Sequence, residues 1–519
     1  MVHLATVKDD KELDTPISKK LENVKIADWD ESDSTMNVYG SRYASEGLPT
    51  GHMPENEMPP EIAYRLIKDH LALDGSPALN LASFVTTYME PQAEALMQEA
   101  LSKNFIDFEE YPQTADIQAK CVNMIARLWN APTDDKSENA MGVSTVGSSE
   151  AIMLATLAMK KRWANKRKAE GKDFSKPNIV MNAAVQVCWE KACRYFDVEE
   201  KYWYCTNDQY LLDPKAAVEL VDENTIGICA ILGSTYTGGY EDVKAINDIL
   251  VEKNIDCPIH VDAASGGFVA PFITPELEWD FRCEKVVSIN ASGHKFGLTY
   301  AGVGWAVWRS KDYLPQELVF NINYLGADQA SFTLNFSKGA SQVIGQYYQL
   351  IRLGKSGYRS IMKNITRTAD YLSDSLEALG FIIMSDKGGK GLPLVAFRLD
   401  PKHNHHFDEF AVAHQLRERG WVVPAYTMAP NAGKLKLMRV VVREDFSRPR
   451  CDSLIVDIKQ AVDALKNMDK ARIDTHMEHV KKDRKNTAKG PGSAGQVHQK
   501  YHKEKHSLQG KHGKTHAIC

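Results

Sequence analysis

The stretch "VVSINASGHKFGLTYAGVGWAVW" (residues 286–308) holds two apolar runs that are separated by a turn of small residues. Nearly continuous apolar runs of this length are typical of strands that are covered on both faces of a sheet. Lys295 lies in the turn directly after the first run. A lysine in such a turn can be desolvated, which lowers its pKa and makes the neutral amine available. The alternative is an ordinary solvated loop lysine.

Similar short apolar runs precede this stretch and alternate with helical patterns such as residues 149–171 and 240–255. They are "GVSTV" (142–146), "NIVMNAA" (178–184), "KYWYC" (201–205), "TIGICAILG" (225–233) and "PIHVDAA" (258–264). Alternation of strands and helices predicts a doubly wound α/β fold. Together with the two opening runs, these segments predict a mostly parallel seven-stranded sheet between helices.

The pattern changes along the chain and predicts four parts. Residues 1–77 form a polar, turn-rich N-terminal segment with a helix at 61–70, and residues 78–365 form the large domain. Residues 366–468 predict a small α+β domain. Its strands are expected at 381–386, 392–399, 421–426 and 434–442, and its helices at 368–380, 408–420 and 451–468. Residues 469–519 form a basic tail with seven of the sixteen His, and disorder is predicted after about residue 485.

Composition excludes several classes of protein. The chain of 519 residues is 25% charged and 43% hydrophobic, as in soluble globular proteins, and its net charge of −5 provides no basic field for nucleic acid. The N-terminus lacks the pattern of a signal peptide, and no apolar run is long enough to span a membrane. Nine cysteines at irregular spacing, without a CxxC motif, indicate reduced thiols in a cytoplasmic protein.

Two further features lie where predicted strands end. Asp262 ends the run at 258–264, and a buried carboxylate needs a partner. That partner could be a structural cation, a metal ion, or the ring nitrogen of pyridoxal phosphate (PLP), and His260 on the same strand face is expected to orient or pack beside Asp262. Ser148 and Ser149 follow Gly147 at a predicted helix start, where backbone N–H groups can hold an anion. The alternative there is an ordinary serine N-cap.

The anion site, Asp262 and Lys295 each follow a predicted strand, which is where open α/β sheets bind their ligands. This order resembles fold-type I PLP enzymes, and specifically the group II amino-acid decarboxylases. Motifs over residues 39–468 resemble the glutamate decarboxylases; among them are "NLASFVTTYMEPQAE" (80–94), "NFIDFEEYPQT" (104–114), "VQVCWEKACRYFDVE" (185–199), "HVDAASGGFVAPF" (260–272), "NASGHKFG" (290–297), "NFSKGASQVIGQYY" (335–348) and "LMRVVVREDF" (437–446). The resemblance implies decarboxylation of L-glutamate to 4-aminobutyrate (GABA) and CO2, with PLP as cofactor and no metal in the site.

The resemblance also implies a role for each matching residue around the cofactor. Lys295 would form the Schiff base with PLP, and Asp262 would pair with the ring nitrogen. The other cofactor contacts would be Ser148, Ser149 and His294 at the phosphate, Thr235 beside Asp262, and Gln186 over the ring face. Ser337 would reach the phosphate from a neighbouring subunit, which implies a homodimer with shared sites; a hexamer is also compatible.

For the substrate, the resemblance implies that Arg439 holds the α-carboxylate, although a surface arginine on a strand is the alternative. Ser83, the Phe84 backbone, Asn104 and Asp107 would bind the side-chain carboxylate. A proton shared between Asp107 and that carboxylate would favour activity below neutral pH. Lys295, or Tyr324 from a mobile loop, would return the proton to Cα.

The tail leaves further alternatives open. Ile473, Met477 and Val480 are at helical spacing before "KKDRK" (481–485), which is compatible with a calmodulin target or with the frayed end of the last helix. The histidines also indicate adventitious nickel or zinc affinity without a defined site. Two other functions compete with glutamate decarboxylation: a related PLP decarboxylase or lyase acting on another acidic amino acid such as aspartate, and a non-catalytic calmodulin-binding scaffold.

Overall fold

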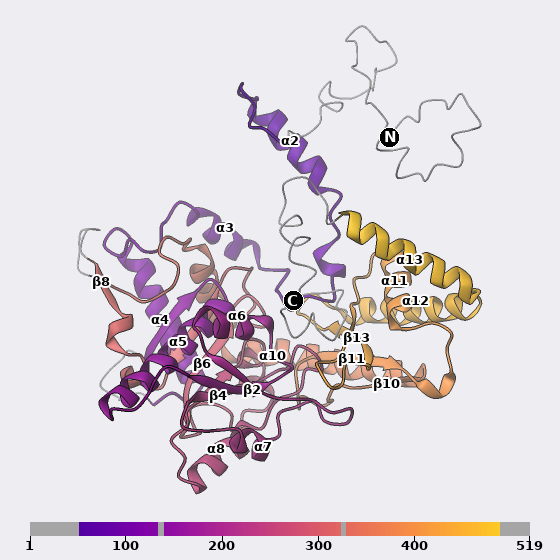
Figure 1. The fold of residues 1–519 in the computed structure, drawn as a ribbon. Helices are drawn as coiled ribbons and strands as arrows, with labels where there is room; N and C mark the ends of the chain where they lie inside the picture. The colour runs from indigo at the N-terminus through magenta and orange to yellow at the C-terminus, as the bar shows by residue number, and fades with distance from the viewer. Residues whose placement is uncertain (1–50, 133–139, 323–328, 488–519) are drawn as a thin grey trace. The chain divides into compact units, whose positions relative to one another are not determined.

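A computed structural model describes residues 51–132, 140–322 and 329–487 (Figure 1). The chain divides into two compact units, residues 1–74 and 75–519. The described part of the first unit holds helix α2 (Pro60–Leu71), which confirms the helix predicted at 61–70 and begins at a proline, as helices often do. No helix in the described ranges combines the length and apolarity needed to cross a bilayer.

The large sheet of the second unit confirms all seven predicted strands. Its order is β1-β7-β6-β5-β4-β2-β3, and β7 is antiparallel to both of its neighbours while the other pairs are parallel. The strands are β1 (Met141–Thr145), β2 (Asn178–Asn182), β3 (Glu199–Trp203), β4 (Thr225–Ile231), β5 (Ile259–Asp262), β6 (Val286–Ser292) and β7 (Gly304–Trp308).

Both faces of this sheet are buried, as the continuous apolar runs predict. Along β4, Ile228 and Ala230 belong to one core cluster, whereas Cys229 and Ile231 belong to another, because alternate side chains point to opposite faces. One face packs on α5 and α6 and the other on α4 and α8. The helices of this region are α3 (Pro91–Glu99), α4 (Pro112–Leu128), α5 (Ser148–Ala169), α6 (Val187–Tyr195), α7 (Pro214–Glu219), α8 (Val243–Glu252) and α9 (Ala270–Ile273). A hairpin of β8 (Phe320–Ile322) and β9 (Gln329–Ser331) lies outside the sheet.

The small sheet is antiparallel in the order β10-β11-β13-β12. Its strands are β10 (Phe381–Ile383), β11 (Leu394–Leu399), β12 (Ala425–Thr427) and β13 (Lys436–Val441). The strand predicted at 421–426 is therefore wrong in its position, because Pro424 has no N–H to give a sheet and Val422 pairs instead with Asn80. The helices are α10 (Ser341–Ala378), α11 (Glu409–Glu418), α12 (Arg448–Lys466) and α13 (Lys470–Thr487).

Helix α10 passes through residue 365, where a boundary between the large and small domains is predicted. Its only non-helical residue, Gly354, has φ 55° and marks a kink within the helix. Short 3-10 turns complete the second unit at η4 (Pro77–Leu79), η5 (Gly266–Phe268), η6 (Lys311–Tyr313), η7 (Gln316–Leu318) and η8 (Pro401–His403). The predicted disorder after residue 485 concerns residues that are mostly outside the described part of the chain.

The antiparallel direction of β7 brings its first residue against the loop that follows β1. A Cβ atom added to Gly304 would lie 2.5 Å from the carbonyl carbon of Gly147 and 2.8 Å from the Ser148 nitrogen. These neighbours are backbone atoms and cannot rotate away. The first residue of β7 must therefore be glycine if helix α5 is to begin where it does.

We expect Gly304→Ala to lower the free energy of unfolding by about 1–3 kcal/mol, because the added methyl group pushes the α5 start away from the sheet. Thermal unfolding measures the effect. Gly75→Ala is the matched control, since a Cβ atom there meets nothing within 4 Å. Equal stability of the two variants would contradict the proposed close packing.

Candidate active site

A cavity of about 370 Å³ opens at the carboxyl ends of the parallel strands. The strand-end rule predicts this position for a ligand site. Seven of the residues implied by the resemblance line it: Ser148, Ser149, Gln186, Thr235, Asp262, His294 and Lys295. They come from the loops after β1, β2, β4, β5 and β6, so the sheet topology alone brings them together.

Asp262 ends β5 and is a buried carboxylate that lines the cavity, with 6% of its surface exposed. Its Oδ2 accepts a hydrogen bond from Trp189 Nε1 at 2.8 Å, and its Oδ1 accepts from Asn290 Nδ2 at 3.1 Å and from the Ala264 amide at 3.2 Å. No Lys, Arg or His within the described ranges forms an ion pair with it. Three neutral donors thus fix a negative charge that faces the cavity without a cation from the protein.

His260 supports this carboxylate from behind. Its Nδ1 and Nε2 lie 2.7 Å from Ser288 Oγ and Asn290 Oδ1, and its ring contacts the Trp189 ring edge to face at 5.3 Å. Complete burial lowers the pKa of His260 to about 4, so the ring is neutral at neutral pH. His260 therefore orients the Asp262 donors, in agreement with the expectation that it packs beside the carboxylate.

The start of helix α5 forms the anion-binding end of the cavity. Ser148 Oγ lies 2.7 Å from Ser292 Oγ, and Ser149 is exposed to the cavity. No side chain caps the helix, so the ordinary serine N-cap is excluded and the first N–H groups face the cavity.

His294 lies beside this helix start. The amides of Gly302 and Val303 donate to its Nδ1 at 3.4 and 3.3 Å, which leaves the ring proton on Nε2. Burial, and then the charge of Lys295, lower the pKa of His294 to about 4. His294 is therefore a neutral Nε2–H donor and not a general base.

Lys295 is half-buried after β6, and its Nζ lies 3.3 Å from Ser265 Oγ. The same Nζ lies 5.3 Å from the centre of the Phe84 ring, and its own carbonyl accepts a hydrogen bond from Thr86 Oγ1 at 2.8 Å. No carboxylate in the described ranges pairs with this amine. The amine of Lys295 makes only weak contacts, with Ser265 and the Phe84 ring, and lies at the cavity wall, where it could react with a ligand. It is therefore not the solvated loop lysine of the alternative interpretation.

Arg439 on β13 is buried, with 5% of its surface exposed, so the alternative of a surface arginine is wrong. Its guanidinium donates to the Thr235 carbonyl and, at 3.0 Å, to the Ala82 carbonyl. It also lies 4.9 Å from the centre of the Phe84 ring. The Phe84 ring thus contacts both Arg439 and Lys295, although neither Arg439 nor Phe84 lines the cavity itself.

The remaining predicted residues do not line this cavity. Ser83 Oγ accepts from the Val85 amide at 3.1 Å. Asn104 pairs with Gly339 in an isolated bridge, and its Oδ1 accepts from the Lys338 amide at 3.4 Å. Asp107 follows in the same loop, and Ser337 is exposed beside the bridge. The structure therefore groups Asn104, Asp107 and Ser337 with one another and not with the other site residues.

Sequence reasoning missed the residues that hold the site from outside. Trp189 and Asn290 fix Asp262, and Glu150 lines the cavity while accepting from the amides of Val146 and Asn335 at 2.8 and 3.1 Å. Trp189 lies one helical turn after Gln186, whose side chain caps α6. That spacing is the only sequence signal that could have indicated Trp189, because the partners of Asn290 and Glu150 are distant along the chain.

The fold and this site define a pyridoxal phosphate-dependent enzyme, and the model of the pyridoxal-dependent decarboxylase conserved domain matches residues 54–400. The chain is 58% identical over 437 residues to a glutamate decarboxylase of Petunia hybrida, covering 83% of this chain and 86% of the relative. A solved glutamate decarboxylase of Lactobacillus brevis is 44% identical with a TM-score of 0.79, covering 83% of this chain and 98% of that one. The chain therefore belongs to the glutamate decarboxylase family of pyridoxal-dependent decarboxylases.

The residues present fit PLP. The anion site at the start of α5 suits a phosphate, and Lys295 suits the aldehyde. Asp262 is a buried carboxylate without a protein cation, so a protonated ring nitrogen would complete its pairing. These observations agree with the predicted cofactor, while the individual roles of the residues stay predictions.

We expect Trp189→Phe to weaken PLP binding by about tenfold or more, because Asp262 loses one of its charge-assisted hydrogen bonds. Equilibrium dialysis of PLP measures the change. Trp163→Phe is the control, since Trp163 Nε1 donates to the Glu223 carbonyl, away from the cavity. Similar PLP affinities of the two variants would contradict the role of Trp189.

Proposed function

We propose that the protein decarboxylates L-glutamate to 4-aminobutyrate and CO2 with PLP as cofactor. The observation that carries the proposal is the cavity in which Lys295 and the unpaired carboxylate of Asp262 meet the helix start at Ser148. The name glutamate decarboxylase, borne by relatives at 54–58% identity, supports the substrate.

Bound PLP supplies an electron sink for the electrons that the departing carboxylate leaves behind. In our proposal Asp262 keeps the ring nitrogen protonated, and the Ser148 and Ser149 helix start with His294 holds the phosphate. Thr235 and Gln186 contact the ring. Lys295 binds the cofactor and then carries the proton that returns to Cα. Tyr324, the other predicted donor, is outside the described part of the chain.

Arg439 is proposed to bind the α-carboxylate of the substrate. Its guanidinium is already desolvated and donates only to two backbone carbonyls among the hydrogen bonds of the described residues, so a carboxylate would be a stronger acceptor. Its Nε has no hydrogen-bond partner in that part of the chain. The Phe84 ring beside it would separate the substrate carboxylate from the amine of Lys295.

We further propose a homodimer in which Asn104, Asp107 and Ser337 serve the site of the partner subunit. Two observations support this arrangement. These residues lie in one region of the structure, around the bridge between Asn104 and Gly339, and they do not line their own cavity. Ser83 would bind the substrate side chain from its own subunit. A cytoplasmic location is proposed as well, since the eight described cysteines are all free and buried.

Calmodulin binding through the tail is less well supported as a second function. Ile473 is buried in the main core cluster, and Met477 packs against it. Calmodulin would have to detach α13 from the small domain to reach these side chains. Val480, the third residue of the stripe, lies where the structure gives no side-chain description.

We expect wild-type enzyme to release CO2 from glutamate much faster than from aspartate, and Lys295→Ala to lose activity together with covalently bound PLP. Borohydride reduction followed by mass spectrometry locates the bound cofactor. Lys253→Ala, at the end of α8, is the control and should keep both properties. Borohydride-fixed PLP on another lysine would contradict the role of Lys295, and preference for aspartate would contradict the substrate.

The shared site predicts complementation between two inactive variants. In a mixture of Lys295→Ala and Asp107→Ala chains, one site of each mixed dimer combines an intact Lys295 with an intact Asp107 from the partner. Random mixing after dissociation should therefore restore about one quarter of the wild-type activity. If Asp107 serves its own subunit, the mixture will remain as inactive as its components.

A further inference from the structure

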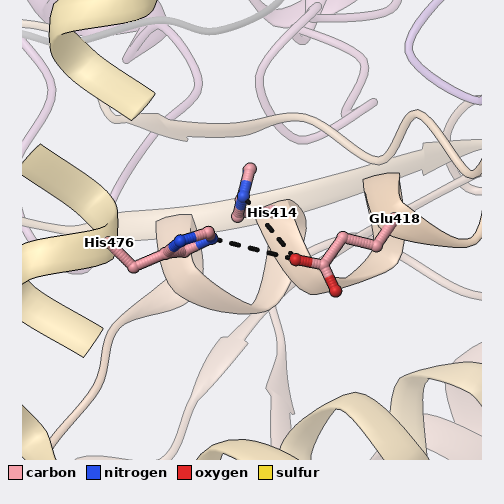
Figure 2. Close-up of side chains that lie close together, drawn as sticks. All are labelled: His414, Glu418 and His476. Atoms are coloured by element: carbon pink, nitrogen blue, oxygen red, sulfur yellow. Dashed lines mark ion pairs between the residues drawn. The ribbon is translucent and has the colours of Figure 1, made fainter. Parts of the chain in front are cut away.

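Three metal-ligating side chains meet on the small domain, away from the cavity. His414 and Glu418 lie one turn apart on α11, and His476 reaches them from α13 (Figure 2). One possible ligand atom of each residue lies within 4.8 Å of the other two. Spacing along the sequence could not reveal this group, because α12 and two strands separate its two helices.

The distances suit an ion better than a direct contact. His414 Nε2 and His476 Nε2 lie 3.9 and 3.8 Å from the same oxygen, Glu418 Oε1. Both distances are too long for a hydrogen bond. Around a tetrahedral zinc ion, with bonds of about 2.0–2.2 Å, neighbouring ligand atoms lie roughly 3.3–3.5 Å apart. On coordination each histidine–carboxylate distance would shorten by about half an ångström. The imidazole nitrogens of the two histidines, which lie within 4.8 Å of each other, would also move closer together.

The chemistry of these side chains selects the ion. Two imidazoles and one carboxylate suit zinc, cobalt or nickel, whereas magnesium and calcium require mainly oxygen ligands. Glu418 and His476 are about half exposed, with 52% and 48% of their side-chain surfaces accessible, so an ion can enter. Gln415 Nε2 donates to Glu418 Oε1 at 3.3 Å and would orient the carboxylate from the second coordination shell.

The two helices that carry the ligands make different contacts with the rest of the chain. Helix α11 packs on β12 and β13, and β13 carries Arg439. Helix α13 contacts the domain through Ile473, which is buried, and through Met477, one residue after His476. An ion at this position would fasten α13 to α11, beside the existing apolar contacts of α13.

We propose that His414, Glu418 and His476 bind one divalent transition-metal ion, of the zinc class, which clamps α13 to α11. Three protein ligands leave a fourth position for water. The site is distinct from the PLP cavity, and decarboxylation does not require it. Its consequence is structural: the ion holds the apolar side of α13, with Ile473 and Met477, against the small domain.

The test uses full-length holoenzyme that has been freed of metal with a chelator and then titrated with Co²⁺. We expect visible cobalt absorption at one ion per chain, displaced by Zn²⁺. His414→Asn, Glu418→Gln and His476→Asn should each weaken this binding by ~100-fold or more, because loss of a ligand exceeds the typical effect of an outer-shell change. Hydrogen exchange should show slower exchange in α13 with Zn²⁺, in the wild type alone.

Asp474→Asn and Glu478→Gln are the matched controls, since both residues lie on α13 within two residues of His476 but outside the triad. Both should retain the wild-type cobalt absorption and the zinc-dependent protection. The histidines after residue 487 are present in every variant, so they cannot cause a difference between them. Absence of tight cobalt binding, equal binding in the triad variants, or binding without protection of α13 would each overturn the proposal.

Discussion

The site depends on one electrostatic constraint, the buried negative charge of Asp262. A buried carboxylate is costly unless it is hydrogen-bonded and paired. Trp189, Asn290 and the Ala264 amide supply the hydrogen bonds, but no cation of the described chain completes a pair. His260 and Asp262 both bond to Asn290, and burial keeps the His260 ring neutral, so it supplies no positive charge. Asp262 therefore still lacks a positively charged partner. Because its carboxylate lines the cavity, the protonated ring of a bound cofactor can provide that charge.

Strand β13 and the residues that follow it contribute two buried arginines near the site. Arg443 donates to the carbonyls of Pro77 and Ser83 at 3.0 and 2.9 Å, and Arg439 donates to the carbonyl of Ala82. These bonds fasten the segment before α3 to β13 and set Phe84 against Lys295. The Phe84 ring thus contacts both Arg439, the proposed substrate-binding residue, and Lys295, the proposed cofactor-binding residue. The proposed metal ion between α11 and α13 would stabilise the packing of α13 near α11, which itself packs on β13.

The sequence was sufficient where the chemistry follows from local pattern. The seven strands follow from apolar runs, and Ser148, Asp262 and Lys295 were predictable because strand ends gather at one edge of a parallel sheet. The burial of Arg439 was not predictable, because an alternating strand pattern does not say what covers either face. The apolar run at 421–426 predicts a strand that includes Pro424, but the proline has no N–H to give a sheet, so the observed strand begins at Ala425.

Contacts between segments that are distant along the chain also could not be predicted from the sequence. The donors to Asp262 come from α6 and β6, and the pairing of Asn104 with Gly339 joins two loops.

The central claim is that Asp262 is the anionic partner of the cofactor ring. Nitrogen-15 NMR of holoenzyme containing PLP labelled at the ring nitrogen tests it most directly. We predict a protonated nitrogen at neutral pH that loses its proton in Asp262→Asn. An unprotonated nitrogen in the wild type would contradict the account.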